Sequence, residues 1–113
     1  MHELALCESI RSIIDEHAAR GGFARVARVS LEIGQFACVE VDALRFGFDV
    51  AMRGGPAEAA ELHIETVPAS AWCMACARPV TIGQRYDPCP ACGSHQIQVT
   101  GGDALRIKSM EVD

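Results

Sequence analysis

Two pairs of cysteines constrain the fold of this 113-residue chain more than any other feature. The segments WCMAC at 72–76 and PCPAC at 88–92 each contain a CxxC pair. A CxxC turn aims two sulfurs at one point, and residues 77–88 suffice for a hairpin that brings the two turns together. Four thiolates at one point form the tetrahedral set typical of structural zinc. The predicted zinc ligands are Cys73, Cys76, Cys89 and Cys92.

Other chemistry uses the same ligands and stays open at this stage. Iron in a rubredoxin-like electron carrier also takes four cysteine thiolates, so the spacing alone does not separate iron from zinc. Two unrelated redox CxxC motifs, or free buried thiols, are further alternatives. A segment of about thirty residues buries too little apolar surface to fold alone, so a bound metal is expected to supply its folding energy. With four cysteine ligands no coordination position is open, which indicates a structural role.

Patterns of apolar residues predict the elements around the cysteine segment. Helical spacing predicts helices over residues 3–20 and 39–52. Alternation of apolar and polar residues predicts strands over 26–34, 61–67 and the closing segment 103–113. On the first helix, the apolar stripe expected on one face consists of Leu6, Ile10, Ile13, Ile14 and His17, with Cys7 beside it at helical spacing.

These elements predict an α/β (α+β) fold: a small three-stranded sheet with two helices, interrupted by an inserted zinc ribbon. Residues 68–99 contain four of the six cysteines and little helical periodicity, so they are expected to form the inserted ribbon. The expected domains are therefore a discontinuous α/β domain, residues 1–67 and 100–113, and a zinc-ribbon domain, residues 68–99.

Composition and charge exclude several classes of function. The formal net charge of −5 argues against nucleic acid as a partner, because phosphate binding depends on Lys and Arg. No apolar run is long enough to span a bilayer, and acidic residues interrupt the first segment, so neither a membrane anchor nor a signal peptide is expected. A cytoplasmic location follows, where cysteines stay reduced. No nucleophile–base pair and no phosphate-binding glycine loop is evident, so an enzyme is not expected.

The first three residues, MHE, offer a second set of metal ligands. The amine of Met1, the amide nitrogen and imidazole Nδ1 of His2, and the amide nitrogen of Glu3 could close chelate rings around one ion. Four nitrogens in a plane suit Ni(II) or Cu(II) and suit zinc poorly. Taken alone, a histidine at position 2 is more often an exposed residue without a role, so this pattern by itself is weak.

Several segments together resemble one family. MHELALCESI, LEIGQFACVE, the AWCMAC…CPACGS ribbon and the final IKSMEVD are similar to segments of the HypA/HybF hydrogenase maturation proteins, which are nickel metallochaperones. The resemblance covers essentially the whole chain, in the family's order. It implies a nickel-binding α/β domain split by a zinc ribbon. When the motifs are matched position by position, the resemblance implies Met1, His2 and Glu3 as nickel ligands and the four cysteines of the CxxC pairs as zinc ligands.

The resemblance also implies partners. These are a HypB-type GTPase and the precursor of the [NiFe]-hydrogenase large subunit, with urease maturation proteins as clients of some relatives. Which client applies stays open, and so does a homodimer. The alternative function is a zinc-ribbon interaction or adaptor module that transfers no metal.

The ribbon departs from some relatives in its histidines. Those relatives carry a histidine two residues after a CxxC pair or directly after its last cysteine, where this chain has Arg78 and Gly93. A pH-dependent exchange of zinc ligands is therefore in doubt. Whether His95 or His63 contributes to metal binding stays open.

Overall fold

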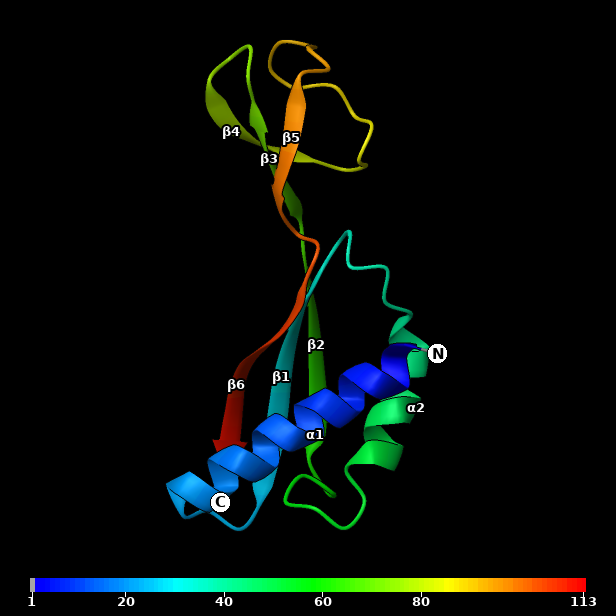
Figure 1. Cartoon of the computed structure of the whole chain (residues 1–113), viewed down its shortest axis with the longest axis vertical. Coiled ribbons are helices and arrows are strands. Elements are labelled where there is room, and N and C mark those ends of the chain that lie inside the picture. Colours follow the sequence, from blue (N-terminus) through cyan, green and yellow to red (C-terminus); the bar gives the residue numbers. More distant parts are fainter. Residues whose placement is uncertain (1) are drawn as a thin grey trace. The chain divides into compact units, whose positions relative to one another are not determined.

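The computed structural model describes residues 2–113, and Met1 lies outside the described residues. It contains two three-stranded sheets, with strand orders β2–β1–β6 and β4–β3–β5. The predicted fold class is confirmed: two helices accompany one small sheet (Figure 1), and the segment with the cysteine pairs lies among the strands of a second small sheet. The elements are α1 His2–Gly21, β1 Val26–Gly34, α2 Val41–Ala51, β2 Glu61–Val67, β3 Ala69–Cys73, β4 Arg78–Ile82, β5 Ile97–Gly101 and β6 Leu105–Val112.

The described chain divides into two compact units. The first comprises residues 2–31 together with Val39–Ile64 and Ile107–Asp113. The second comprises Glu32–Cys38 and Glu65–Arg106. The second unit contains all of the segment expected to form the ribbon and extends beyond it at both ends. The domain borders expected from the sequence stay a prediction.

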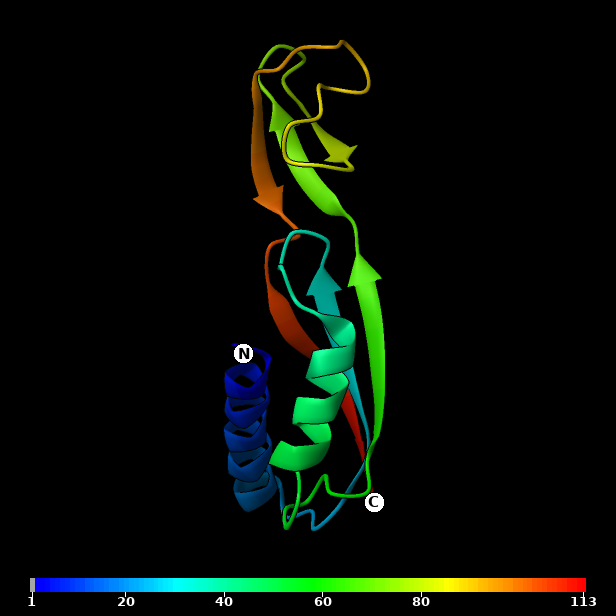
Figure 2. The ribbon, with the colours of Figure 1, turned by 90° about the vertical axis from the view of Figure 1, so that its right-hand side faces the viewer.

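Helices α1 and α2 pack side by side in the first unit (Figure 2). Their contact can be close because α2 has a glycine there: a Cβ on Gly47 would lie 3.3 Å from the Cys7 sulfur and 3.4 Å from the Leu4 Cα. The Cys7 thiol donates to the Leu44 carbonyl at 3.4 Å. The Arg11 guanidinium donates to the Ala51 carbonyl at 2.8 Å, which satisfies an acceptor at the carboxyl end of α2.

The buried face of α1 differs from the expected stripe. Cys7, Ile10 and Ile14 are buried, whereas Ile13 is 42% exposed and His17 is exposed. The prediction was therefore right for Ile10 and Ile14 and wrong for Ile13 and His17. The physical reason is that α2 packs on the Cys7 side of α1, which turns the core-facing stripe away from Ile13.

The second unit has a small core of its own. Strand β3 pairs antiparallel with both β4 and β5. Ala69, Ala71 and Ile82 form a buried apolar cluster, with Phe36, Val80, Ile97 and Val99 packed against it. A close backbone approach completes this packing: Gly102 has a φ of +89°, and a Cβ there would lie 2.5 Å from the Ala69 Cα. Only glycine fits at this position, because both the conformation and the contact exclude a side chain.

The described residues contain no helix suited to crossing a membrane. Neither α1 nor α2 combines the length and the apolar character that crossing a bilayer requires.

Candidate metal centres

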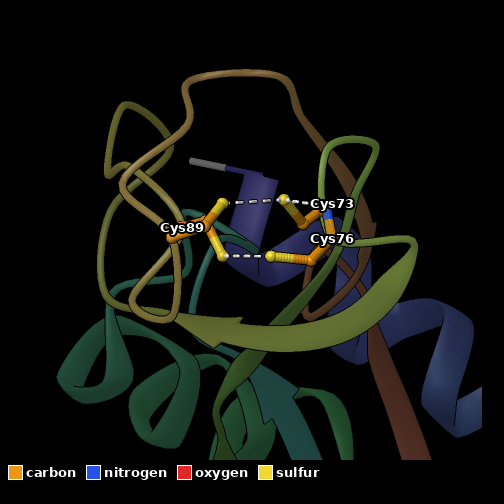
Figure 3. A group of neighbouring side chains, drawn as sticks. Cys73, Cys76 and Cys89 are labelled. Atoms are coloured by element: carbon orange, nitrogen blue, oxygen red, sulfur yellow. Dashed lines mark hydrogen bonds between the residues drawn. The ribbon is translucent and has the colours of Figure 1, made fainter.

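The four cysteines of the CxxC pairs converge in the second unit. Their sulfur atoms all lie within 4.8 Å of one another. The Cys73 and Cys92 sulfurs are 3.7 Å apart, and the Cys76 and Cys89 sulfurs are 3.9 Å apart. A tetrahedron with Zn–S bonds of about 2.3 Å has sulfurs about 3.8 Å apart, so this spacing fits a zinc ion at the centre. In Figure 3 the side chains of Cys73 and Cys76 point towards that of Cys89.

Local backbone turns aim the first two sulfurs. Cys73 ends strand β3, and the Ala77 N–H donates to the Cys73 carbonyl at 2.8 Å. Ala77 adopts a φ of +54°, which turns the chain back towards strand β4. The backbone N–H of Cys76 donates to the Cys73 sulfur at 3.4 Å. An N–H directed at a sulfur stabilises the thiolate that a metal needs.

The second CxxC pair repeats this arrangement on the other side of the cluster. The Gly93 N–H donates to the Cys89 carbonyl at 2.8 Å, and Gly93 has a φ of +77°. The Ala91 N–H donates to the Cys89 sulfur at 3.4 Å. The four-cysteine set is therefore built by two similar turns, each with a residue in the left-handed region that closes it.

The sulfurs differ in how readily they lose a proton. Hydrogen bonding to Cys92, followed by burial, raises the pKa of Cys76 to about 12. Burial opposes the Cys89 thiolate too, but hydrogen bonds from the backbone N–H groups of Ala91 and Cys92 and from the Cys73 and Cys92 side chains together lower the pKa of Cys89 to about 6. Closely spaced thiolates repel one another, and a dication at the centre removes that repulsion.

The described part of the amino-terminal motif lies in the first turn of α1. The His2 side chain is 55% exposed, while that of Glu3 is only 9% exposed. A Glu3 carboxylate oxygen accepts from the Glu40 N–H at 3.2 Å, and this bond is the largest cause that lowers the pKa of Glu3 to about 2. Glu40 is the N-cap of α2. An ionised Glu3 therefore ties the start of α1 to the start of α2.

Of the predicted nickel ligands that the structure describes, the His2 side chain is exposed and the Glu3 side chain is largely buried. The first four N–H groups of an α-helix have no intrahelical acceptor, so the amide nitrogens of His2 and Glu3 are not committed to the helix. The imidazole Nδ1 of His2 lies 3.3 Å from the Glu3 carboxylate and has to turn away from it to reach a metal. The amine of Met1 belongs to the residue outside the described range, so the complete nickel set stays a prediction.

His63 and His95 are not part of the four-cysteine group. His63 is exposed on strand β2, and His95 is exposed between the second CxxC pair and strand β5. Within residues 2–113 the four cysteines form a metal-ligating group without either of them. Sequence reasoning missed the link between Glu3 and Glu40, because those residues are far apart in the chain and no motif connects them.

Cys7 and Cys38, which lie outside the cluster, should differ in reactivity. Burial raises the pKa of Cys7 to about 11, whereas Cys38 is exposed. At pH 8 we expect a thiol-specific disulfide reagent to modify Cys38 in the zinc-loaded protein and to spare Cys7 until the protein unfolds. Mass mapping of the modified peptides measures this. Fast modification of Cys7 in the folded protein would show that α1 and α2 separate readily.

The chain combines a helix–sheet unit with a unit that contains four converging cysteines. This combination defines a small metal-binding protein with a zinc-ribbon-like part. The family model described as "Hydrogenase/urease nickel incorporation, metallochaperone, hypA" matches residues 1–112. The chain therefore belongs to the HypA family, as the resemblance of its motifs indicated.

Similar proteins support this assignment along the whole chain. "Hydrogenase maturation factor HypA" of Acidithiobacillus ferrooxidans is 53% identical over 113 residues, which cover 100% of both chains. The protein of the same description from Azoarcus sp. (strain BH72) is 53% identical over 110 residues, covering 97% of this chain and 96% of that protein. The solution structure of the Ni metallochaperone HypA from Helicobacter pylori has a TM-score of 0.75, 23% identity and coverage of 99% and 97%. That last likeness shows a shared fold.

Proposed function

We propose that this chain is a nickel metallochaperone that binds Ni(II) at its amino terminus and delivers it to the [NiFe]-hydrogenase large subunit. Nickel is held by the Met1 amine, the amide and imidazole nitrogens of His2, and the Glu3 amide. The observation that carries the proposal is the position of His2 and Glu3 in the first helical turn, where backbone nitrogens have no intrahelical acceptor. Membership of a nickel-incorporation family supports it.

The ligand set suits an ion that is carried and then released. The amine and the His2 amide close a five-membered ring on the metal, and the His2 amide and imidazole close a six-membered ring. Amide nitrogens bind only after losing a proton, so nickel affinity falls as pH falls. The Glu3 carboxylate is bound to the Glu40 N–H, so its part is to position the terminus rather than to ligate. The imidazole is exposed, and an acceptor protein can reach it.

The four-cysteine site has a separate, permanent role in this proposal. Zinc held by Cys73, Cys76, Cys89 and Cys92 supplies folding energy to the second unit and no catalysis, because four thiolates leave no open coordination position. A HypB-type GTPase and the large-subunit precursor are the proposed partners, and urease maturation proteins are a further client. The alternative, an adaptor without metal transfer, shares the zinc site and lacks the nickel site.

Nickel titration of histidine variants tests the proposal. We expect His2→Ala to weaken nickel binding more than about 100-fold. Residues that only hydrogen-bond to metal ligands already change metal affinity by about 10–100-fold when they are replaced, and His2 is a ligand itself. His17→Ala is the matched control, since His17 is an exposed histidine on the same helix. It should bind nickel as the unchanged protein does. Equal nickel affinity in all three proteins would reject the amino-terminal site, and absence of nickel binding in the unchanged protein would favour the adaptor.

A further inference from the structure

An apolar groove is lined by residues of both helices of the first unit, next to the start of α1. It has a volume of about 190 Å³. Gly47 allows the helices to approach here, and the Phe46 side chain is 72% exposed beside it. Leu4 on the facing helix is 39% exposed. The groove residues are Glu3, Leu4, Ala43, Phe46, Gly47 and Val50.

The surroundings of the groove are acidic. Glu3 is one of the residues that line it. Glu8 follows Leu4 by one turn of α1, and Asp42 precedes Phe46 by one turn of α2. Both Glu8 and Asp42 are exposed, and neither has an ion-pair partner among residues 2–113. The exposed carboxylates of Glu8 and Asp42 beside an apolar groove favour a ligand that carries positive charge.

The nearby arginines do not offset these carboxylates. The Arg53 guanidinium pairs with Asp49 at 3.3 Å. The Arg11 guanidinium pairs with Asp15 and donates to the Ala51 carbonyl. A third arginine, Arg45, donates to the Leu62 carbonyl at 3.0 Å. These three guanidinium groups thus have partners of their own, whereas the exposed Glu8 and Asp42 leave negative charge beside the groove.

We propose that this groove docks an amphipathic helix of a partner protein, with aliphatic side chains entering the groove and Lys or Arg flanking them. The aliphatic side chains would bury the exposed Leu4 and Phe46. The flanking cations would pair with Glu8 and Asp42, and the exposed Phe46 ring offers them a cation–π contact. A second copy of this chain fits poorly, because it would bring the same carboxylates against each other.

The groove adjoins the residues that carry nickel in the proposed function. A partner docked against Leu4 comes next to Glu3 and the terminus, where an acceptor of the ion has to be. That the docked partner receives nickel rests on the proposed function, whereas the docking itself rests on the groove and its charges. The two can therefore fail independently.

Two synthetic helical peptides serve as probes. Both carry leucines at helical spacing on one face, and one has lysines beside the stripe where the other has glutamates. We expect the lysine peptide to bind the isotope-labelled full chain, to shift the NMR signals of Leu4, Phe46 and Gly47, and to bind more weakly as salt rises. The glutamate peptide should bind at least about tenfold more weakly.

Variants of exposed residues locate the binding. Phe46→Ala should weaken the lysine peptide about tenfold or more, and Asp42→Asn should weaken it less. Tyr86→Ala is the control, because Tyr86 is an aromatic residue 86% exposed in the second unit, and it should have no effect. Phe46→Ala should leave nickel affinity unchanged. Loss of nickel binding in the unchanged chain, with peptide binding intact, would reject the proposed function and leave the docking standing.

Three outcomes would overturn the proposal. The first is equal binding of both peptides, or of neither, because charge selection is its central claim. The second is equal binding by the Phe46→Ala variant, which would place the peptide elsewhere. The third is self-association of the unchanged chain in sedimentation that Phe46→Ala abolishes, which would make a second copy the occupant of the groove.

Discussion

Replacement of Cys76 by serine is expected to release the zinc and unfold the second unit while the helices of the first unit stay folded. The core of the second unit consists of two alanines and Ile82, with partly buried side chains around them. Burying a large aliphatic side chain contributes only about 1.5–3 kcal/mol, and an alanine contributes less. Structural zinc supplies about 10–16 kcal/mol in small zinc-finger peptides. The metal therefore stabilises this unit more than its apolar core does.

Metal analysis and NMR test this expectation together. The Cys76→Ser protein should lose its zinc, and the amide signals of strands β3, β4 and β5 should collapse towards unfolded values. Signals of α1 and α2 should keep their dispersion. The matched control is Cys38→Ser, which removes an exposed thiol of the same unit that is not part of the cluster. Full zinc retention in Cys76→Ser, or zinc loss without any change in strands β3–β5, would contradict the expectation.

Local sequence patterns sufficed for the parts of this molecule that local geometry determines. The CxxC spacing predicted that the sulfurs of each pair would face one point, and the structure brings all four within 4.8 Å. Each turn is closed by hydrogen bonds between residues a few positions apart, such as that from Gly93 to Cys89. The two helices and the outer three strands followed in the same way from their apolar periodicity.

Contacts between residues far apart in the chain could not be predicted in this way. The bond from the Glu40 N–H to the Glu3 carboxylate joins the starts of two helices, and no spacing rule links them. The exposure of Ile13 depends on which side of α1 receives α2, which periodicity alone leaves undecided. The groove beside Phe46 exists because Gly47 lies opposite Cys7, so it appears only once the helices are packed.

The amino terminus carries the second large prediction. Addition of two residues, Gly-Ser, before Met1 is expected to weaken nickel binding more than about 100-fold. Loss of a residue that only supports a metal ligand already weakens metal binding by up to about 100-fold. The extension converts the Met1 amine into an amide and moves the free amine out of the five-membered ring with His2. The imidazole and the Glu3 amide remain, but they no longer belong to a set of four nitrogens in one plane. Isothermal titration with Ni(II) measures the effect.

Two controls distinguish an effect on nickel binding from an effect on zinc binding. The same two residues placed after Asp113 should change nothing, because the carboxyl end contributes no ligand to the proposed set. Zinc content should stay equal in both extended proteins, since the four-cysteine site lies in the other unit. Nickel affinity of the unchanged chain should also rise with pH, because binding releases amide protons. Nickel held as tightly with the extension before Met1 as without it would show that the amine is not a ligand, and the site would then have to be built from His2 and other donors.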